Sequence, residues 1–394
     1  MYCTCIRDSL TSTWLQPTEQ NRQMRINRPH LIDSTLREGE QTPGVLFTDK
    51  DKDNIIAKLY QIGIEEIELG IAAPMNTSLP GLVKEARKRT AGSCRLSLWC
   101  RCKAEDIAFA ATCRPDLLAL SIPVSDAHIQ ERLGKDRAWI RKTLAASMQQ
   151  ALAAGIPAVA VGMEDASRAD RDFLCATAKI AERHGAARIR LADTVGVCSP
   201  ARITDLVQFL RKTVSIPLAV HCHNDFGMAT ANSVAALEAG ADSLDATVLG
   251  LGERAGNCRL EEVIGYLAFV LGEKRYHTEF LPELCRFVAG TAGRDIADNH
   301  PLIGSTIFTC ESGLHQHGLT VNPQMYEPYA PERVGGKRRL GFGGKTGVKA
   351  VQLQLRQAGL RLDEMQIKDL VRRIRSCGRV LNREQLLRFA AESC

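Results

Sequence analysis

Eight short apolar runs recur between residues 30 and 250, and they constrain the possible fold more than any other feature of this sequence. Most of them are apolar throughout, as expected of strands that are covered on both faces. Their starts are spaced by roughly 30 residues, the length of one strand–helix unit. The runs are Leu31–Asp33, Ile64–Gly70, Cys94–Trp99, Leu117–Ile122, Ala158–Met163, Arg188–Asp193, Pro217–His223 and Ser243–Val248.

Stretches with helical periodicity separate these runs, and several end in a glycine that suits a left-handed helix cap, including Gly63, Gly155, Gly185 and Gly240. Eight such units in about 250 residues predict a closed (β/α)8 barrel. An open, doubly wound sheet is the alternative, but such a sheet usually has a glycine-rich turn after its first strand, and none is present here. We therefore expect a catalytic barrel over residues 29–290.

The chain on either side of this region has a different character. Residues 291–394 begin with a loop-rich stretch, Asn299–Gly347, and continue with three amphipathic helical patterns. We expect a smaller, mainly helical lid or dimerisation subdomain there. Its helical patterns are Lys349–Leu360, Asp363–Cys377 and Arg383–Ala390. Residues 1–28 are expected to be a disordered extension, and Met24 is a second candidate for the translation start.

Composition and charge exclude several classes of function. No apolar run approaches the ~18 residues that cross a bilayer, and no secretory signal is visible, so we expect a cytoplasmic protein without a membrane partner. The 14 cysteines include no C-x-x-C pair, which favours free thiols. Residues 331–394 carry 15 Lys/Arg against 6 Asp/Glu, but no nucleic-acid-binding motif accompanies them. A solvated helical face, or a surface that attracts phosphates, explains this charge.

Polar or ionisable residues follow nearly every predicted strand, at the end where the active sites of such barrels form. The sharpest signal is His221–His223, because strand alternation places both imidazoles on one face. Two imidazoles and a carboxylate leave open positions on a divalent cation, and Glu38 is the natural third ligand. Two hydrogen-bonded histidines that face the barrel interior are the alternative. The glycine-rich Gly341–Gly347 lacks the spacing of a P-loop.

Two motifs resemble those of a known enzyme family. Leu31–Gln41 resembles the D-x-T-L-R-[DE]-G-x-Q opening of the acyl-CoA/2-oxo acid condensing enzymes, namely the homocitrate, 2-isopropylmalate and citramalate synthases. His221–Gly227 resembles their H-x-H-[ND]-D-x-G signature, and Gly250–Asn257 and Ser312–His315 match two further family segments. Segments such as Glu164–Asp170 resemble most closely the homocitrate synthases of nitrogen fixation.

The resemblance implies a site for one divalent metal ion, Mg²⁺, Mn²⁺ or Zn²⁺. The implied ligands are Glu38, His221, His223 and Asn257. Arg37 and Thr194 would contact the carboxylate of the 2-oxo acid. Lysine-pathway members read the distal carboxylate through a histidine and an arginine, but Ser97 and Ala160 stand at those positions here. Arg101 is our candidate for that role.

The resemblance also implies the reaction, in which acetyl-CoA condenses with 2-oxoglutarate and thioester hydrolysis releases homocitrate and CoA. Glu164 and His315 would form the acid/base system, and Tyr326 matches a family tyrosine, although Cys310 replaces a common histidine. A homodimer is implied, with His315 completing the neighbouring active site, and nitrogenase cofactor synthesis is the implied role. Three alternatives stay open: a citramalate or 2-isopropylmalate synthase, a metal-dependent acyl-CoA lyase, and a pseudoenzyme without activity.

Overall fold

The computed structural model describes residues 28–392, and these fold into two units. Residues 28–268 and Glu273–Ile296 form the barrel unit, whereas Phe269–Gly272 and residues 297–392 form the C-terminal unit. The predicted disordered extension falls almost wholly outside the described residues. Across residues 28–392, none of the helices combines the length and hydropathy required to span a bilayer.

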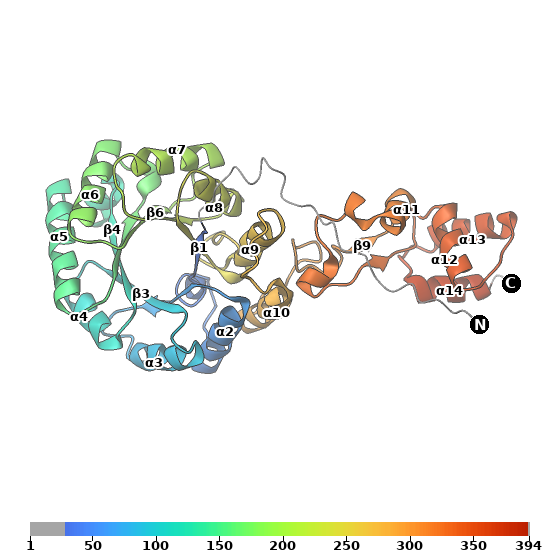
Figure 1. The fold of residues 1–394 in the computed structure, drawn as a ribbon, viewed down its shortest axis with the longest axis horizontal. Helices are drawn as coiled ribbons and strands as arrows, with labels where there is room; N and C mark the ends of the chain where they lie inside the picture. The colour runs from blue at the N-terminus through green and yellow to red at the C-terminus, as the bar shows by residue number, and fades with distance from the viewer. Residues whose placement is uncertain (1–27, 393–394) are drawn as a thin grey trace, which may run out of the picture. The chain divides into compact units, whose positions relative to one another are not determined.

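Eight parallel strands close into a barrel in which each strand pairs with its sequence neighbours and β1 pairs with β8. This arrangement confirms the predicted fold class, and Figure 1 shows the helices as an outer ring around the strands. The strands are β1 (His30–Asp33), β2 (Glu66–Ile71), β3 (Arg95–Arg101), β4 (Leu117–Pro123), β5 (Val159–Glu164), β6 (Arg188–Asp193), β7 (Leu218–Cys222) and β8 (Ser243–Ala246).

A helix follows each strand, and the predicted glycine caps are present. Gly63 ends α2 with a φ of 97°, and Gly155, Gly185 and Gly240 also have positive φ values, which glycine adopts without steric cost. The helices of this unit are α2 (Asp49–Ile62), α3 (Leu79–Arg89), α4 (Ala104–Cys113), α5 (Arg137–Ala153), α6 (Arg171–Arg183), α7 (Pro200–Arg211), α8 (Ala229–Glu238), α9 (Leu260–Phe269) and α10 (Leu281–Ala292).

The interior of the barrel contains buried ion pairs that cross it and a small apolar cluster. Glu66 and Glu68 of β2 meet Arg188 and Arg190 of β6 at 2.7 and 3.0 Å, and contacts between strands that are not neighbours must cross the interior. Leu117 and Ala119 of β4 and Ala160 of β5 form the apolar cluster, and Trp99 packs against it. Branched apolar side chains fill most barrels of this type, so the charged layers are an early sign of a polar site.

The C-terminal unit has its own hydrophobic core. Helices α12 (Val348–Gln357), α13 (Glu364–Ser376) and α14 (Arg383–Ala391) correspond to the three predicted helical patterns, and their apolar faces bury side chains such as Ile374. The stretch that we expected to be loop-rich also contains a short parallel sheet, β9 (Thr309–Cys310) with β10 (Arg339–Leu340), and helix α11 (Gly313–Val321).

Candidate metal centre and active site

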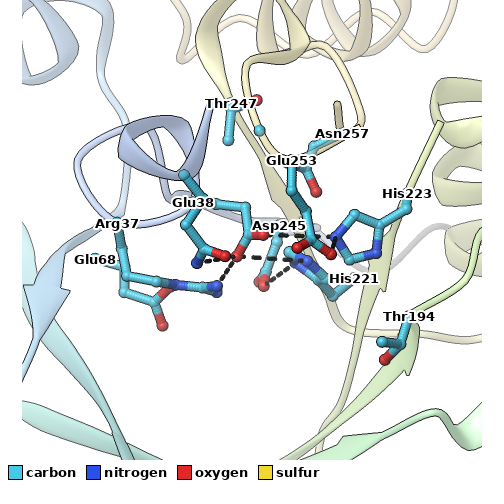
Figure 2. Close-up of polar contacts among 12 residues, drawn as sticks. Arg37, Glu38, Glu68, Thr194, His221, His223, Asp245, Thr247, Glu253 and Asn257 are labelled. Carbon is cyan, nitrogen blue, oxygen red and sulfur yellow. Dashed lines mark hydrogen bonds and ion pairs between the residues drawn. The ribbon is translucent and has the colours of Figure 1, made fainter. Parts of the chain in front are cut away.

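Three side chains, one from the turn after β1 and two from the end of β7, come together at the carboxyl-terminal end of the barrel. His221 lies near the end of β7, His223 follows two residues later on the same face, and Glu38 lies in the tight turn after β1. One ligand atom from each residue lies within 4.8 Å of the others, and all three residues are buried. Figure 2 shows the carboxylate of Glu38 and the two imidazole rings pointing toward one another.

Hydrogen bonds at the far side of each ring orient the two histidines. His221 Nδ1 donates to Oδ2 of Asp245 at 2.9 Å, and His223 Nδ1 donates to the backbone oxygen of Asp193 at 3.2 Å. Each Nε2 therefore carries the free lone pair of its ring. Nε2 of His221 lies 3.9 Å from a carboxylate oxygen of Glu38, and Nε2 of His223 lies 3.5 Å from the other oxygen. Burial lowers the pKa of His221 to about 4 and also lowers the pKa of His223, so both rings are neutral near pH 7.

This donor set fits a divalent metal ion. Nε2 of His223 is buried and finds no hydrogen-bond partner among residues 28–392, which a histidine with a purely structural role would be expected to have. Neutral imidazole nitrogens and a carboxylate are ordinary ligands of Zn²⁺ and Mn²⁺, and three protein ligands leave positions open for substrate. The group thus fits a catalytic rather than a closed structural site.

Asn257, the fourth predicted ligand, lies beside the strand end that carries His223. A bridge pairs the backbones of Asn257 and His223, and Nδ2 of Asn257 donates to the backbone oxygen of Leu251 at 2.9 Å. Its Oδ1 is buried and has no hydrogen-bond partner in the described part of the chain. An amide oxygen in this state is free to accept a further contact.

A series of buried ion pairs connects Arg37 with His221. Arg37 forms an ion pair with Glu38, and its Nε donates to Oε2 of Glu68 at 2.6 Å. Glu68 also accepts from Arg190 at 3.0 Å, and Arg190 lies 3.0 Å from Asp245, which holds His221. Although burial disfavours the charged carboxylate, the Arg190 guanidinium and the hydrogen bond from His221 keep the pKa of Asp245 below its usual value.

The sequence analysis did not identify Arg190 or Asp245 as functional residues. Two signals were present in the sequence: an arginine two residues after Arg188 in an otherwise apolar strand, and an aspartate two residues before Thr247 in another. Glu253, which was also not identified, has an oxygen 3.8 Å from Nε2 of His223.

Glu164 ends β5 at the same end of the barrel. Its Oε1 accepts a hydrogen bond from the hydroxyl of Ser121 at 2.8 Å, and its Oε2 forms an ion pair with Arg132. Arg132 ends a π-helix, Ala127–Arg132, that follows β4. Glu164 is therefore held in one orientation by two neighbours while its side chain stays partly open to solvent.

The next residue, Asp165, takes the left-handed conformation with a φ of 59°, which is uncommon outside glycine and often accompanies functional sites. Its N–H donates to Oγ1 of Thr194 at 2.8 Å, so the Thr194 hydroxyl keeps its own proton for another partner. Arg101 behaves differently, because its Nε and Nη2 donate to buried Asp106 at 2.7 and 3.0 Å. Only Nη1 of Arg101 has no described partner.

His315 and Tyr326, the two predicted site residues beyond the barrel, lie together in the C-terminal unit. His315 is on α11, and its ring lies 4.4 Å from the ring of Tyr326. The following residue, Gln316, donates from its side chain to the backbone oxygens of Cys310 and Gly341 at 2.8 and 2.6 Å. These contacts fix α11 against the end of β9 and against the residue that follows β10.

A closed barrel that gathers a buried Glu–His–His group and an arginine at the carboxyl ends of its strands defines a barrel enzyme with a site for a divalent metal ion. Residues 28–288 match the HMGL-like family model, and residues 302–381 match a model described as homocitrate synthase post-HMGL domain-like. The chain belongs to the HMGL-like family, which confirms the broader family predicted from the motifs and does not separate the homocitrate synthases from the other members.

Relatives with different activities resemble the chain to similar extents. It is 41% identical to a homocitrate synthase of Frankia alni, over 83% of this chain and 93% of the relative. It is 36% identical to 2-isopropylmalate synthase 2 of Caldanaerobacter subterraneus, over 90% and 92%, and 37% identical to a putative (R)-citramalate synthase of Archaeoglobus fulgidus, over 88% and 71%. The chain is thus an acyltransferase of the group that carries out a Claisen-type condensation.

Solved structures agree on the fold. The HMG-CoA lyase of Bacillus subtilis superimposes with a TM-score of 0.62 at 17% identity, covering 68% of this chain and 95% of the lyase. A carboxyl transferase domain of Rhizobium etli pyruvate carboxylase gives a TM-score of 0.55 at 17% identity, over 79% of this chain and 56% of that chain. At these identities the likeness concerns the barrel architecture alone.

Proposed function

We propose that the chain is a homocitrate synthase, which condenses acetyl-CoA with 2-oxoglutarate and hydrolyses the thioester to release homocitrate and CoA. The observation that carries this proposal is the buried Glu38, His221 and His223 group with Arg37 in contact with it. A 2-oxo acid presents a ketone and a carboxylate on adjacent carbons, and these match a metal ion and a guanidinium. Identity to the Frankia alni enzyme supports the choice of oxo acid, and nitrogenase cofactor synthesis is the proposed use of the product.

Glu38, His221 and His223 would hold the metal ion, with Asn257 as a fourth candidate ligand. When bound, the ion supplies Lewis acidity to the ketone of the oxo acid. Arg37 is fixed by Glu68, so its positive charge is already in place when negative charge develops on the substrate oxygen. The O–H of Thr194 donates to the substrate carboxylate.

Proton transfer is assigned to Glu164 and His315. The methyl group of an acetyl thioester is a very weak acid, so its base must be held in the correct geometry and shielded from water. Ser121 and Arg132 hold Glu164 in one orientation, and its side chain stays partly open to solvent, so bound substrate would have to complete the shielding. Tyr326 contacts His315 and orients its ring. Arg101, through its free Nη1, is our candidate for the distal carboxylate of 2-oxoglutarate.

The experiment that tests this function measures release of the CoA thiol from acetyl-CoA, with Mg²⁺, Mn²⁺ or Zn²⁺ added, across four oxo acids. We expect 2-oxoglutarate to be preferred over 2-oxoadipate, pyruvate and 2-oxoisovalerate. A preference for pyruvate or 2-oxoisovalerate would instead support a citramalate or 2-isopropylmalate synthase, the second candidate, which the relatives of 36–37% identity favour. His221→Ala is the control and should abolish release with all four acids.

A homodimer in which His315 serves the neighbouring barrel is the proposed assembly. His315→Ala and Glu38→Gln variants should each be inactive, because each site needs both residues. Mixing the two variants under conditions that exchange subunits should restore up to about a quarter of the activity, since random exchange gives half heterodimers and each has one intact site. Mixtures that stay inactive while mass spectrometry detects heterodimers would exclude a shared site.

A further inference from the structure

The C-terminal unit contains a cavity of about 670 Å³ with three arginines in its wall. One side is formed by β10 and the residue before it, and the other by the start of α14. Phe342 and Leu381, next to these segments, exchange two backbone hydrogen bonds of 2.8 Å, which fix the separation of the two sides. The lining residues are Leu319, Arg338, Arg339, Leu340, Asn382, Arg383 and Glu384.

The three arginines differ in their partners. Arg338 is held by Glu327 through two contacts, 2.6 Å from Nε and 2.5 Å from Nη2. Nε of Arg383 donates to Gln354 at 2.9 Å, which leaves both terminal nitrogens of that guanidinium available. The guanidinium of Arg339 is exposed and makes no ion pair or hydrogen bond with another described side chain. Since Glu384 is the one acidic residue in the lining, the wall carries excess positive charge.

The first turn of α14 adds further donors. Asn382 and Gln385 form a capping box in which each side chain accepts from the other's N–H at 2.9 Å. The N–H groups of Arg383 and Glu384 lie in the same turn and, as in any first turn, have no partner within the helix. The positive end of the helix dipole therefore reinforces the charge of the arginines at this wall.

We propose that this cavity binds a ligand through a phosphate group. A guanidinium offers paired N–H donors that match the oxygens of a phosphate, and Arg339 and Arg383 both have such donors free. Leu319 and Leu340 supply an apolar part of the wall for the rest of the ligand. The phosphate belongs either to acetyl-CoA, in which case this inference rests on the proposed function, or to a separate effector.

A ligand in the cavity would contact α11, the helix that carries the proposed catalytic residue His315. Leu319 lies on α11 four residues after His315, about one helical turn away. A ligand against Leu319 therefore contacts the same helix that holds the proposed acid/base histidine. This gives an effector at this position a direct physical route to the rate of condensation.

The test uses pyrophosphate as the probe and isothermal titration calorimetry of the full chain. We expect wild-type protein to bind pyrophosphate and an Arg339→Gln/Arg383→Gln double variant to lose at least tenfold in affinity. The matched control is Arg372→Gln/Arg379→Gln, which removes two exposed charges from the same unit outside the cavity and should bind as wild type does. If the double variant unfolds, Arg339→Gln alone serves, because its side chain holds no other residue. Absence of binding to wild type, or equal binding to both double variants, would overturn the proposal.

A kinetic comparison separates the two sources of the phosphate. If the cavity takes the phosphates of CoA, the Arg339→Gln/Arg383→Gln variant raises KM several-fold for acetyl-CoA and leaves it unchanged for S-acetyl-N-acetylcysteamine, which has the thioester but no phosphate. If a separate effector binds, KM stays the same for both thioesters while pyrophosphate affinity still falls. Calorimetry measures pyrophosphate binding without catalysis. Its result therefore still tests the phosphate site if the chain does not catalyse the proposed condensation.

Discussion

Replacing Asp245 by asparagine should weaken metal binding without unfolding the barrel. Asp245 accepts the Nδ1 proton of His221 at 2.9 Å and lies 3.0 Å from Nε of Arg190, and all three side chains are buried. Asparagine keeps the shape of aspartate but removes the charge that fixes the His221 tautomer and increases the basicity of its Nε2. Substitution of such partners in other metal sites typically costs 10–100-fold in metal affinity.

At 1.4 kcal/mol per tenfold, this range corresponds to about 1.4–2.8 kcal/mol of binding free energy. Titration of Mn²⁺ against the metal-free protein, followed by electron paramagnetic resonance, measures it directly. The matched control is Asp242→Asn, which removes the aspartate that pairs with Arg211 and accepts from the N–H of Leu218 at the opposite end of the barrel. That variant should bind Mn²⁺ as wild type does. Unchanged Mn²⁺ affinity in a folded Asp245→Asn protein would refute the orienting role.

Three further outcomes follow from the structure. Glu164→Gln should lower kcat by about 10²–10⁴ while leaving Mn²⁺ affinity within twofold, because the residue is outside the metal group, and steady-state kinetics with calorimetry would reveal any departure. Burial raises the pKa of Glu261 to about 7, so the unfolded chain loses this proton first as pH rises, and stability should fall by about 3 kcal/mol between pH 4.5 and 7. Burial also raises the pKa of Asp33 to about 7, which adds a similar loss in the same range. Urea unfolding at several pH values should therefore show a smaller loss in Glu261→Gln than in wild type; equal losses in the two proteins would contradict the prediction. Ile374 is fully buried in the core of the C-terminal unit, so Ile374→Ala should lower the free energy of unfolding of that unit by about 2–5 kcal/mol. Residues 297–392 should then be proteolysed faster than the barrel, and equal rates for the two units would argue against a separate core.

The Glu38, His221 and His223 group could be predicted from the sequence because its geometry depends on local rules. Alternation along a strand places His221 and His223 on one face whatever the rest of the chain does. Glu38 lies in the turn after β1, and the turns after barrel strands line the same end of the barrel. The same reasoning located Glu164, whose position depends only on where β5 ends.

The buried ion pairs and helix α11 depend instead on contacts between distant segments. Arg190 contacts Glu68 and Asp245 only because the barrel closes, and the residue pattern within one strand does not predict these partners. Helix α11 was expected to be part of a loop-rich stretch because glycines interrupt it. Gln316 nevertheless anchors the helix to the end of β9 and to the residue after β10, two strands that the sequence pattern did not reveal. Such contacts override weak local propensity.

The position of the metal group has a consequence for how the chain matures. Glu38 follows the first strand, whereas His221 and His223 belong to the seventh, and β1 is brought toward them only by pairing with β8. During synthesis the carboxylate therefore leaves the ribosome long before either imidazole, and no chain that ends before residue 223 can offer all three. The three ligand atoms come together only when the ring closes, so an ion held by all three would oppose reopening of the seam between the first and last strands.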